Sequence, residues 1–367
     1  MTTRSVHAHP HCDCFCFIAP PDLLAHLAKE GTPEQRDAAL QTIASSASIR
    51  ARRSIISELL QSSDTRAAAF AFMAVPAQAE RTVYDAQHGG QASLPGQKVR
   101  GEGDAPTADD GANEAYDGAG TTYEFYEQVF SRNSIDGAGM DILSSVHFGV
   151  GYDNAFWNGS QMVYGDGSGR IFVKGGLTKD VDVVAHELTH GVTQMTAGLE
   201  YAKQPGALNE SFSDVFGSLV KQHHLGQTAA EADWLIGAGI LGSALHGRAL
   251  RSMKAPGTAN DLDRQAGSMR GYADLPDDDD PAHDNGGVHV NSGIPNRAFY
   301  LAAAAIGGHA WEAAGRIWYV TLTAHLEPTS DFRAAADATI AVAGDLFGAS
   351  SPEHQAVSGA WKEVGVL

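Results

Sequence analysis

The chain changes character near residue 180, and this change limits the fold more than any other feature of the sequence. Residues 82–175 are rich in Gly, Asp and Tyr and contain short β-type runs such as 82–84 and 171–173, which is typical of a twisted antiparallel sheet. One helix is expected inside this part, around 121–130. Longer helical patterns follow over 180–197, 207–224, 292–306, 308–325 and 331–346. This order predicts an α+β protein with a β-rich first lobe and a mainly α-helical second lobe.

Charge and composition exclude several classes of partner. The formal net charge is −19 over 367 residues, and such an acidic surface repels nucleic acid and anionic membranes. No stretch approaches the roughly 20 apolar residues of a membrane-spanning helix. We therefore expect neither nucleic acid nor a membrane as a partner. The acidity also suits a protein that binds hard cations such as calcium.

All three cysteines, Cys12, Cys14 and Cys16, lie near the N-terminus, so we expect the main fold to lack disulfides and to depend on its core and on any bound metal. Together with His7 and two further histidines they form a cluster with two open interpretations: a zinc or copper site, or a tail without a role. The first 18 residues also lack the long apolar run of a secretory signal. The precursor is therefore expected to stay inside the cell or to leave it by another route.

The strongest chemical signal is the run His186-Glu187-Leu188-Thr189-His190. Two histidines four residues apart on a helix face one point, because this spacing rotates them by only about 40°. A catalytic zinc site needs three protein ligands and one open position for water. Glu187 lies beside the first ligand and is the natural base for a zinc-bound water. Since five residues can match by chance, the interpretation depends on a third ligand.

Glu210 is the best candidate for that third ligand, twenty residues after His190. A metzincin would instead have Gly at 193 and His at 196, where this chain has Thr193 and Thr196. Asp214 lies four residues after Glu210 on the same predicted helix and could accept a hydrogen bond from a ligand histidine. Two solvent-facing acids are the alternative, which the apolar and small neighbours disfavour.

A further His-Asp pair lies in the run 284–289. Hydrolysis of a peptide needs a group that stabilises the oxyanion on the carbonyl being attacked. An Asp that is hydrogen-bonded to an imidazole favours its protonated, donating form. We therefore expect Asp284 to hold His289 as the donor to the oxyanion.

These ordered motifs resemble those of the thermolysin-like (M4) zinc metallopeptidases, over nearly all of the chain from about residue 80 to 367. The runs that carry the resemblance are 154–159, 182–190, 206–210, 250–253 and 284–292. Tyr201 follows His190 by eleven residues, which is similar to family members. The resemblance implies a thermolysin-like two-lobed α+β fold, with the zinc site in the cleft between the β-rich and the helical lobe.

The resemblance also implies roles for the matching residues. The zinc ligands would be His186, His190 and Glu210. Glu187 would be general base and proton shuttle, while His289 and Tyr201 would hold the oxyanion and Asp284 would orient His289. Asn154 and Ala155 would bind the substrate backbone in extended form, and Arg251 would contact a carbonyl on the primed side. An apolar primed-side pocket would be lined by Phe172, Leu177, Val183 and Leu250. The implied activity is a neutral metalloendopeptidase that cuts on the N-terminal side of large hydrophobic residues.

The N-terminal part resembles the short propeptide of the protealysin-type branch, through the PPDLL run at 20–24 followed by helices. The implied division is a propeptide over 1–68, a β-rich catalytic lobe with the HExxH helix over 69–203, and a helical lobe over 204–367. The enzyme would be a monomeric zymogen whose partners are protein or peptide substrates and its own propeptide, an intramolecular inhibitor. Apolar residues such as Ile55, Leu59 and Phe70 could fill the primed-side pocket. The precursor would be cytoplasmic, and the mature enzyme would be secreted by a non-standard route.

One departure from the family concerns calcium. Relatives rich in calcium place two ions beside the position of Asp182, using carboxylates from the helix that bears the third zinc ligand. Here that helix position is Lys221, a cation that cannot bind calcium. We therefore expect an ion pair between Lys221 and Asp182 in place of the double-calcium site.

Two other functions stay open as alternatives. A catalytically weak zinc-binding or protein-interaction member of the same fold would lack a catalytic residue, and none is missing. A zinc aminopeptidase would carry an upstream Gly-x-Met-Glu-Asn element, which the nearest run, 139–141, does not match.

Overall fold

The structure is a computed structural model that describes residues 16–61 and 79–367. Its first lobe is built on a six-stranded sheet in the order β1-β5-β6-β4-β2-β3. The strands are β1 (Cys16–Phe17), β2 (Arg81–Asp85), β3 (Gln97–Arg100), β4 (Ile142–Val146), β5 (Ala155–Trp157) and β6 (Met162–Tyr164). The edge strand β1 therefore comes from the N-terminal segment and pairs with β5 of the lobe.

The sheet is mixed, so the prediction of an antiparallel sheet is wrong for two of its five strand pairs. β4 runs parallel to both β2 and β6, whereas β1–β5, β5–β6 and β2–β3 are antiparallel. Parallel neighbours need a crossover connection, and helix α3 (Asp110–Phe130) lies between β3 and β4 in the chain. The strand predicted at 171–173 is also wrong, because Phe172 forms only an isolated bridge with Leu241.

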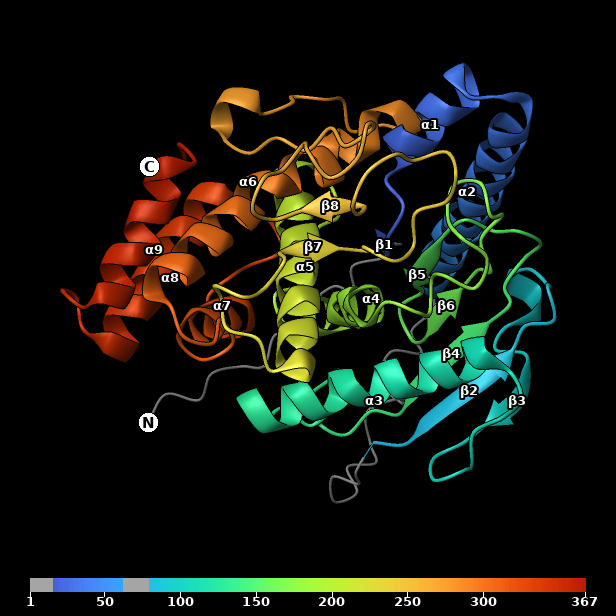
Figure 1. Cartoon of the computed structure of the whole chain (residues 1–367), viewed down its shortest axis with the longest axis horizontal. Coiled ribbons are helices and arrows are strands. Elements are labelled where there is room, and N and C mark those ends of the chain that lie inside the picture. The colour runs from blue at the N-terminus through green and yellow to red at the C-terminus, as the bar shows by residue number, and fades with distance from the viewer. Residues whose placement is uncertain (1–15, 62–78) are drawn as a thin grey trace.

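Helices α4 (Val181–Gln194) and α5 (Lys203–Leu225) meet at the centre of the molecule (Figure 1). Gly217 allows their close approach: a Cβ at this position would lie 2.6 Å from the Asp182 carbonyl oxygen and 3.4 Å from the His186 Cβ. α3 packs against α4 from the side of the sheet. The contact between α4 and α5 fixes the distance between the HExxH run and Glu210.

The second lobe consists mainly of helices on the other side of α5 (Figure 1). They are α6 (Asp284–Ile306), α7 (Ala313–Ala324), α8 (Phe332–Phe347) and α9 (Pro352–Glu363), and a short pair β7 (Leu235–Ile236) with β8 (Arg251–Ser252) lies beside α5. The first residues of α6 are not helical, since Asn285, Gly286 and Gly287 have φ of 50°, 81° and 84°. This left-handed turn explains why the helical periodicity begins later than Asp284.

The N-terminal segment forms a helical hairpin of α1 (Pro21–Glu30) and α2 (Pro33–Gln61) beside the sheet (Figure 1). Thr32 and Gln35 cap the start of α2 reciprocally: Gln35 N donates to Thr32 Oγ1 at 3.4 Å, and Thr32 N donates to Gln35 Oε1 at 2.8 Å. The side chains of Ile55 and Leu59, and Phe70 as a whole, lie outside the described part of the chain. None of the helices over 16–61 and 79–367 has the length and apolarity needed to cross a membrane.

Candidate active site

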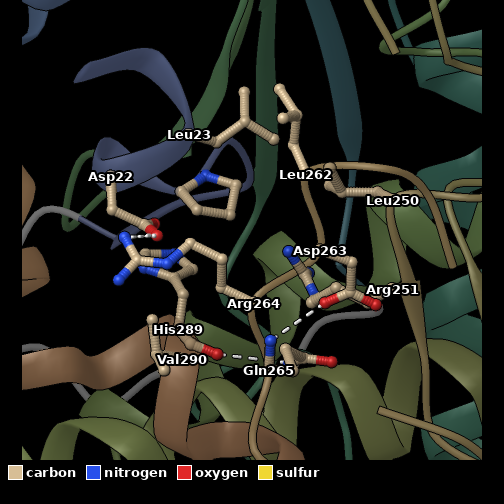
Figure 2. Close-up of a pocket in the computed structure, with 11 residues that line it drawn as sticks. Asp22, Leu23, Leu250, Arg251, Leu262, Asp263, Arg264, Gln265, His289 and Val290 are labelled. Atoms are coloured by element: carbon tan, nitrogen blue, oxygen red, sulfur yellow. Dashed lines mark hydrogen bonds and ion pairs between the residues drawn. The ribbon is translucent and has the colours of Figure 1, made fainter. Parts of the chain in front are cut away.

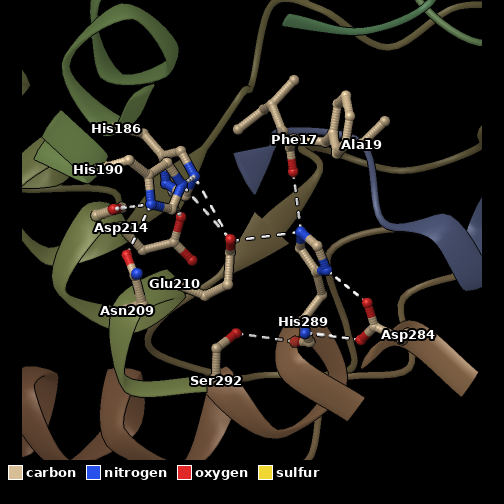
Figure 3. A network of polar contacts seen from close by, with 12 residues as sticks. Phe17, Ala19, His186, His190, Asn209, Glu210, Asp214, Asp284, His289 and Ser292 are labelled. Atoms are coloured by element: carbon tan, nitrogen blue, oxygen red, sulfur yellow. Dashed lines mark hydrogen bonds and ion pairs between the residues drawn. The ribbon is translucent and has the colours of Figure 1, made fainter. Parts of the chain in front are cut away.

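Three buried side chains from α4 and α5 converge on one point (Figure 3). His186 Nε2 and His190 Nε2 lie 3.1 Å apart, and Glu210 oxygens lie 3.5 Å from the first and 3.4 Å from the second. A metal ion is typically bound by His, Cys, Asp or Glu side chains. Within the described part of the chain, this is the one group of three or more of them whose ligand atoms all lie within 4.8 Å of one another. The helical spacing of four residues places both imidazoles on the same side of α4.

The donor set fits zinc. Two ligand atoms bound at about 2.0–2.1 Å in tetrahedral geometry lie about 3.3 Å apart, close to the separation of the two imidazole nitrogens. Among the described residues, Glu187 Oε1 and Glu210 Oε2 are buried and receive no hydrogen bond. A cation with a water molecule would satisfy both oxygens.

Each histidine is oriented through its other ring nitrogen. His186 Nδ1 lies 2.8 Å from Asp214, and His190 Nδ1 lies 2.8 Å from Asn209 Oδ1. Asp214 is itself held by Arg251 and by Asn296, with nitrogen–oxygen distances of 2.7 Å and 2.8 Å. Such contacts fix the tautomer and the direction of a metal-binding imidazole. Sequence reasoning missed Asn209, although its place directly before Glu210 could have indicated it.

Glu187 points into the same space from α4. Its Oε2 accepts a hydrogen bond from Trp157 N at 3.1 Å. Burial, together with the nearby carboxylate of Glu210, raises the pKa of Glu187 well above its ordinary value. A carboxylate tuned in this direction binds protons more readily, as a general base near neutral pH must.

Two further side chains face the three zinc-ligand candidates: His289, which belongs to α6, and Tyr201, which precedes α5. Asp284 Oδ1 lies 2.6 Å from His289 Nδ1, and the Tyr201 hydroxyl lies 3.4 Å from Nε2. The same hydroxyl donates to Glu210. Burial by itself would lower the pKa of His289, but the carboxylates of Glu210 and Asp284 outweigh it and raise that pKa to about 9. His289 is thus a protonated donor near neutral pH.

The main chain of the N-terminal segment lies in front of this cluster as an added strand. His289 Nε2 donates to the Phe17 carbonyl at 2.9 Å, as Figure 3 shows. Ile18 N donates to the Ala155 carbonyl at 3.2 Å. Strand addition to a sheet edge is a common mode of peptide binding, and here the bound peptide belongs to the chain itself.

Two further contacts hold the residues after Phe17. Arg251 Nη1 donates to the Ile18 carbonyl at 3.0 Å, and Ala19 N donates to Asn154 Oδ1 at 2.9 Å. Asn154, Ala155 and Arg251 are thus the residues that hold this backbone. Ile18 thus lies beside the cluster, while the pocket-filling role expected of Ile55, Leu59 and Phe70 falls on side chains outside the described part of the chain.

The four side chains expected to form the apolar pocket are all buried. Phe172, Leu177, Val183 and Leu250 belong to the same cluster of core side chains as Ile18, which is fully buried. Leu250 and Arg251 also line a small cavity between α1 and the second lobe, shown in Figure 2. In that cavity Asp22 of α1 pairs with Arg264 at 3.2 Å.

Lys221 of α5 and Asp182 in the first turn of α4 form a close ion pair. Lys221 Nζ lies 2.8 Å from Asp182 and 3.1 Å from Asp233, and it donates to the Leu235 carbonyl at 2.6 Å. The ammonium thus links α4, α5 and β7.

A buried site of two imidazoles and a carboxylate, with a peptide chain held against it, defines the class of metallopeptidases. Comparisons with known proteins agree. The model of the thermolysin metallopeptidase catalytic domain matches residues 63–194, and that of its alpha-helical domain matches residues 197–366. An extracellular metalloprotease of Pectobacterium carotovorum subsp. carotovorum is 47% identical over 96% of each chain. Protease PrtS of Photorhabdus sp. (strain Az29) is 42% identical over 95% of this chain and 91% of its own.

Among solved structures, the precursor of protealysin from Serratia proteamaculans matches with a TM-score of 0.81 and 47% identity, covering 96% of this chain and 100% of the other. The chain therefore belongs to the thermolysin (M4) family of metallopeptidases and is a metalloendopeptidase of the protealysin type, with the thermolysin-like fold.

Proposed function

We propose that this protein is a zinc-dependent neutral endopeptidase, made as a zymogen, that hydrolyses peptide bonds on the N-terminal side of large hydrophobic residues. One observation carries the proposal: the main chain over 16–19 lies against the three-ligand cluster in extended form, with the Phe17 carbonyl on His289. The side chain that follows this carbonyl, Ile18, is apolar and fully buried.

Zinc held by His186, His190 and Glu210 would supply Lewis acidity, which polarises a carbonyl and lowers the pKa of water. Glu187 takes a proton from the attacking water and passes it to the leaving nitrogen. His289 and Tyr201 donate to the carbonyl oxygen as negative charge develops on it. Asp284 keeps the proton on His289.

The remaining site residues position the substrate. Asn154, Ala155 and Arg251 hold its backbone as they hold the N-terminal segment, so the bond to be cut is fixed close to the reacting groups. The apolar side chains Phe172, Leu177, Val183 and Leu250 favour a large hydrophobic residue after the cut. Asp214 orients His186.

The N-terminal segment acts as an inhibitor within the same molecule, because it fills the cleft that a substrate needs. We assign residues 1–68 to the propeptide, 69–203 to the β-rich catalytic lobe and 204–367 to the helical lobe. We further propose a monomer with a cytoplasmic precursor, which becomes extracellular by a non-standard route. The Pectobacterium relative is named an extracellular metalloprotease, which supports the last step.

The test compares the wild type with Glu187→Ala. Both proteins are expected to bind one zinc ion, measured by elemental analysis of purified protein. Only the wild type should hydrolyse an internally quenched peptide and shed roughly its first 50–75 residues, and the variant should be slower by about 10³-fold or more. Equal hydrolysis by both proteins would refute the role of Glu187. Zinc binding without any hydrolysis by the processed wild type would instead favour the catalytically weak alternative.

A further inference from the structure

Polar contacts with His289, Ala155, Arg251 and Asn154 fix which residues of the N-terminal segment lie in the cleft. Antiparallel pairing sets Cys16 opposite Trp157 and Phe17 opposite Phe156. On the other side of Phe17, the N–H and the carbonyl of Ile18 are both held, by Ala155 and by Arg251. The Phe17–Ile18 peptide bond is thus held through its own N–H group and through contacts on both sides.

The polarity of this bond is that of a substrate. Its carbonyl oxygen accepts from His289 Nε2 at 2.9 Å, and the residue after it carries the buried apolar side chain. A chain bound in the reverse direction would present an N–H where His289 donates. The segment thus meets the donor, the backbone anchors and the apolar core in the order that the proposed reaction needs.

We propose that the active site cleaves the Phe17–Ile18 bond of its own chain. The inhibitory segment is then a slowly cleaved substrate. This inference rests on the proposed function. The oxygen of water bonds to the Phe17 carbonyl carbon while the bond from that carbon to the Ile18 nitrogen breaks. Glu187 carries a proton of the water to that nitrogen. The second proton of the water also ends on that nitrogen, so the products are a carboxylate at Phe17 and an ammonium group at Ile18, with no oxidation or reduction.

The contacts on both sides explain why such a cut is slow to complete. Phe17 is held by β5 and lies 5.5 Å from the Phe156 ring, measured between centroids. On the other side, Ala19 is bound by Asn154, and Asp22 by Arg264. The new carboxyl end at Phe17 and the new amino end at Ile18 stay close together as long as both are held. Their high effective concentration lets the peptide bond re-form readily. The cut becomes permanent when either fragment leaves the cleft.

The experiment follows the zinc-loaded full chain by intact-mass spectrometry and N-terminal sequencing, next to hydrolysis of an internally quenched peptide. The expected product is a fragment of residues 1–17 together with a new N-terminus at Ile18. Because the segment lies in the cleft of its own molecule, the rate of this cut should not change with protein concentration. Glu187→Ala should not produce the fragment.

Two variants test whether the cut depends on the placement of Ile18. Ile18→Val keeps an apolar side chain and should keep the cut, whereas Ile18→Gly should slow it by about tenfold or more. A synthetic peptide of residues 10–25 should also be cut after Phe17 by the activated wild type.

The protein could hydrolyse the quenched peptide while the Phe17–Ile18 bond stays intact both in the chain and in the synthetic peptide. This result would overturn the inference and leave the proposed function standing. No hydrolysis of any peptide by the zinc-loaded protein would overturn both.

Discussion

Asp284 has a separate task for each of its carboxylate oxygens. Oδ2 accepts hydrogen bonds from the main-chain N–H groups of His289 and Val290, at 2.7 Å and 3.1 Å, where the helical part of α6 begins. Oδ1 lies 2.6 Å from the His289 ring. The left-handed turn at 285–287 makes this possible, and a Cβ at Gly287 would lie 2.7 Å from the Asn291 side chain. Asp284 therefore caps the start of the helical part of α6 and also favours the protonated form of His289.

Asp284→Asn should shift the alkaline limb of the pH–activity profile. In the wild type, activity should fall as pH rises through the pKa of His289, which the nearby carboxylates hold above its ordinary value. Without the Asp284 carboxylate the pKa of His289 falls, so the alkaline loss should begin about one pH unit or more lower. The acid limb, set by Glu187, should stay in place. The measurement is kcat/KM from pH 5 to 10, with the exposed Asp278→Asn as control. An unmoved alkaline limb in Asp284→Asn would contradict this role.

Lys221→Met should destabilise the fold, because Asp182 is fully buried and would lose its counter-charge. Breaking one side of a buried pair costs roughly 3 kcal/mol of unfolding free energy. Urea unfolding of the zinc-loaded Glu187→Ala protein measures this, with the exposed Lys174→Met as control. If the ammonium replaces calcium, millimolar calcium should not move the wild-type unfolding midpoint. A stable Lys221→Met protein, or clear stabilisation of the wild type by calcium, would argue against the exchange.

At the scale of elements, helices with strong periodicity were predictable and elements defined by packing were not. α4, α5 and α8 lie within a few residues of their predicted ranges, whereas α9 was missed. α3 begins at Asp110, well before 121, because small residues that read as loop form its packed face. A Cβ at Gly118, for example, would lie 3.1 Å from Val184 of α4. The parallel pairing of β4 depends on long-range contacts, so local alternation could not indicate it.

The candidate site divides in the same way. The sequence places His186, Glu187 and His190 by spacing alone, and Glu210 by its place on the next helix. No local pattern marks Ile18, since its importance comes from the pairing of β1 with β5 across more than a hundred residues. The dipeptide Pro20-Pro21 was the nearest signal, because it forces an extended entry into α1.

Docking of α1 should weaken as pH rises, because of Asp22. Burial of this carboxylate, and then Asp284 nearby, raises its pKa from 3.8 to about 6, although His289 and Arg264 act in the opposite direction. The docked segment therefore holds a proton more tightly than a free one. The resulting penalty on docking is absent below the ordinary pKa and complete above about 6.

Hydrogen exchange of the Ile18 and Ala19 amides in zinc-loaded Glu187→Ala can measure this. After correction for intrinsic exchange, protection should fall by about tenfold or more between pH 5 and 7. Asp22→Asn should remove the pH dependence, while the exposed Asp37→Asn should keep it. Identical pH profiles for Asp22→Asn and the Glu187→Ala parent would exclude Asp22 as the cause.

At the scale of the whole molecule, the N-terminal segment adds a strand to the sheet and occupies the active site. It supplies the sixth strand beside β5, and its carbonyls occupy the donors His289 and Arg251. A chain organised in this way cannot bind a substrate and its own segment at once. Activity should therefore depend on how far the segment has left the cleft, and zinc content should not.

The most direct measurement follows peptide hydrolysis and intact mass together in freshly purified, zinc-loaded protein. We predict that intact chains do not hydrolyse the added peptide, and that its hydrolysis rises in proportion to the fraction of molecules that have lost the N-terminal segment. Zinc should stay at one ion per molecule throughout. Full hydrolysis by chains that keep residues 1–68 intact and bound would contradict this prediction.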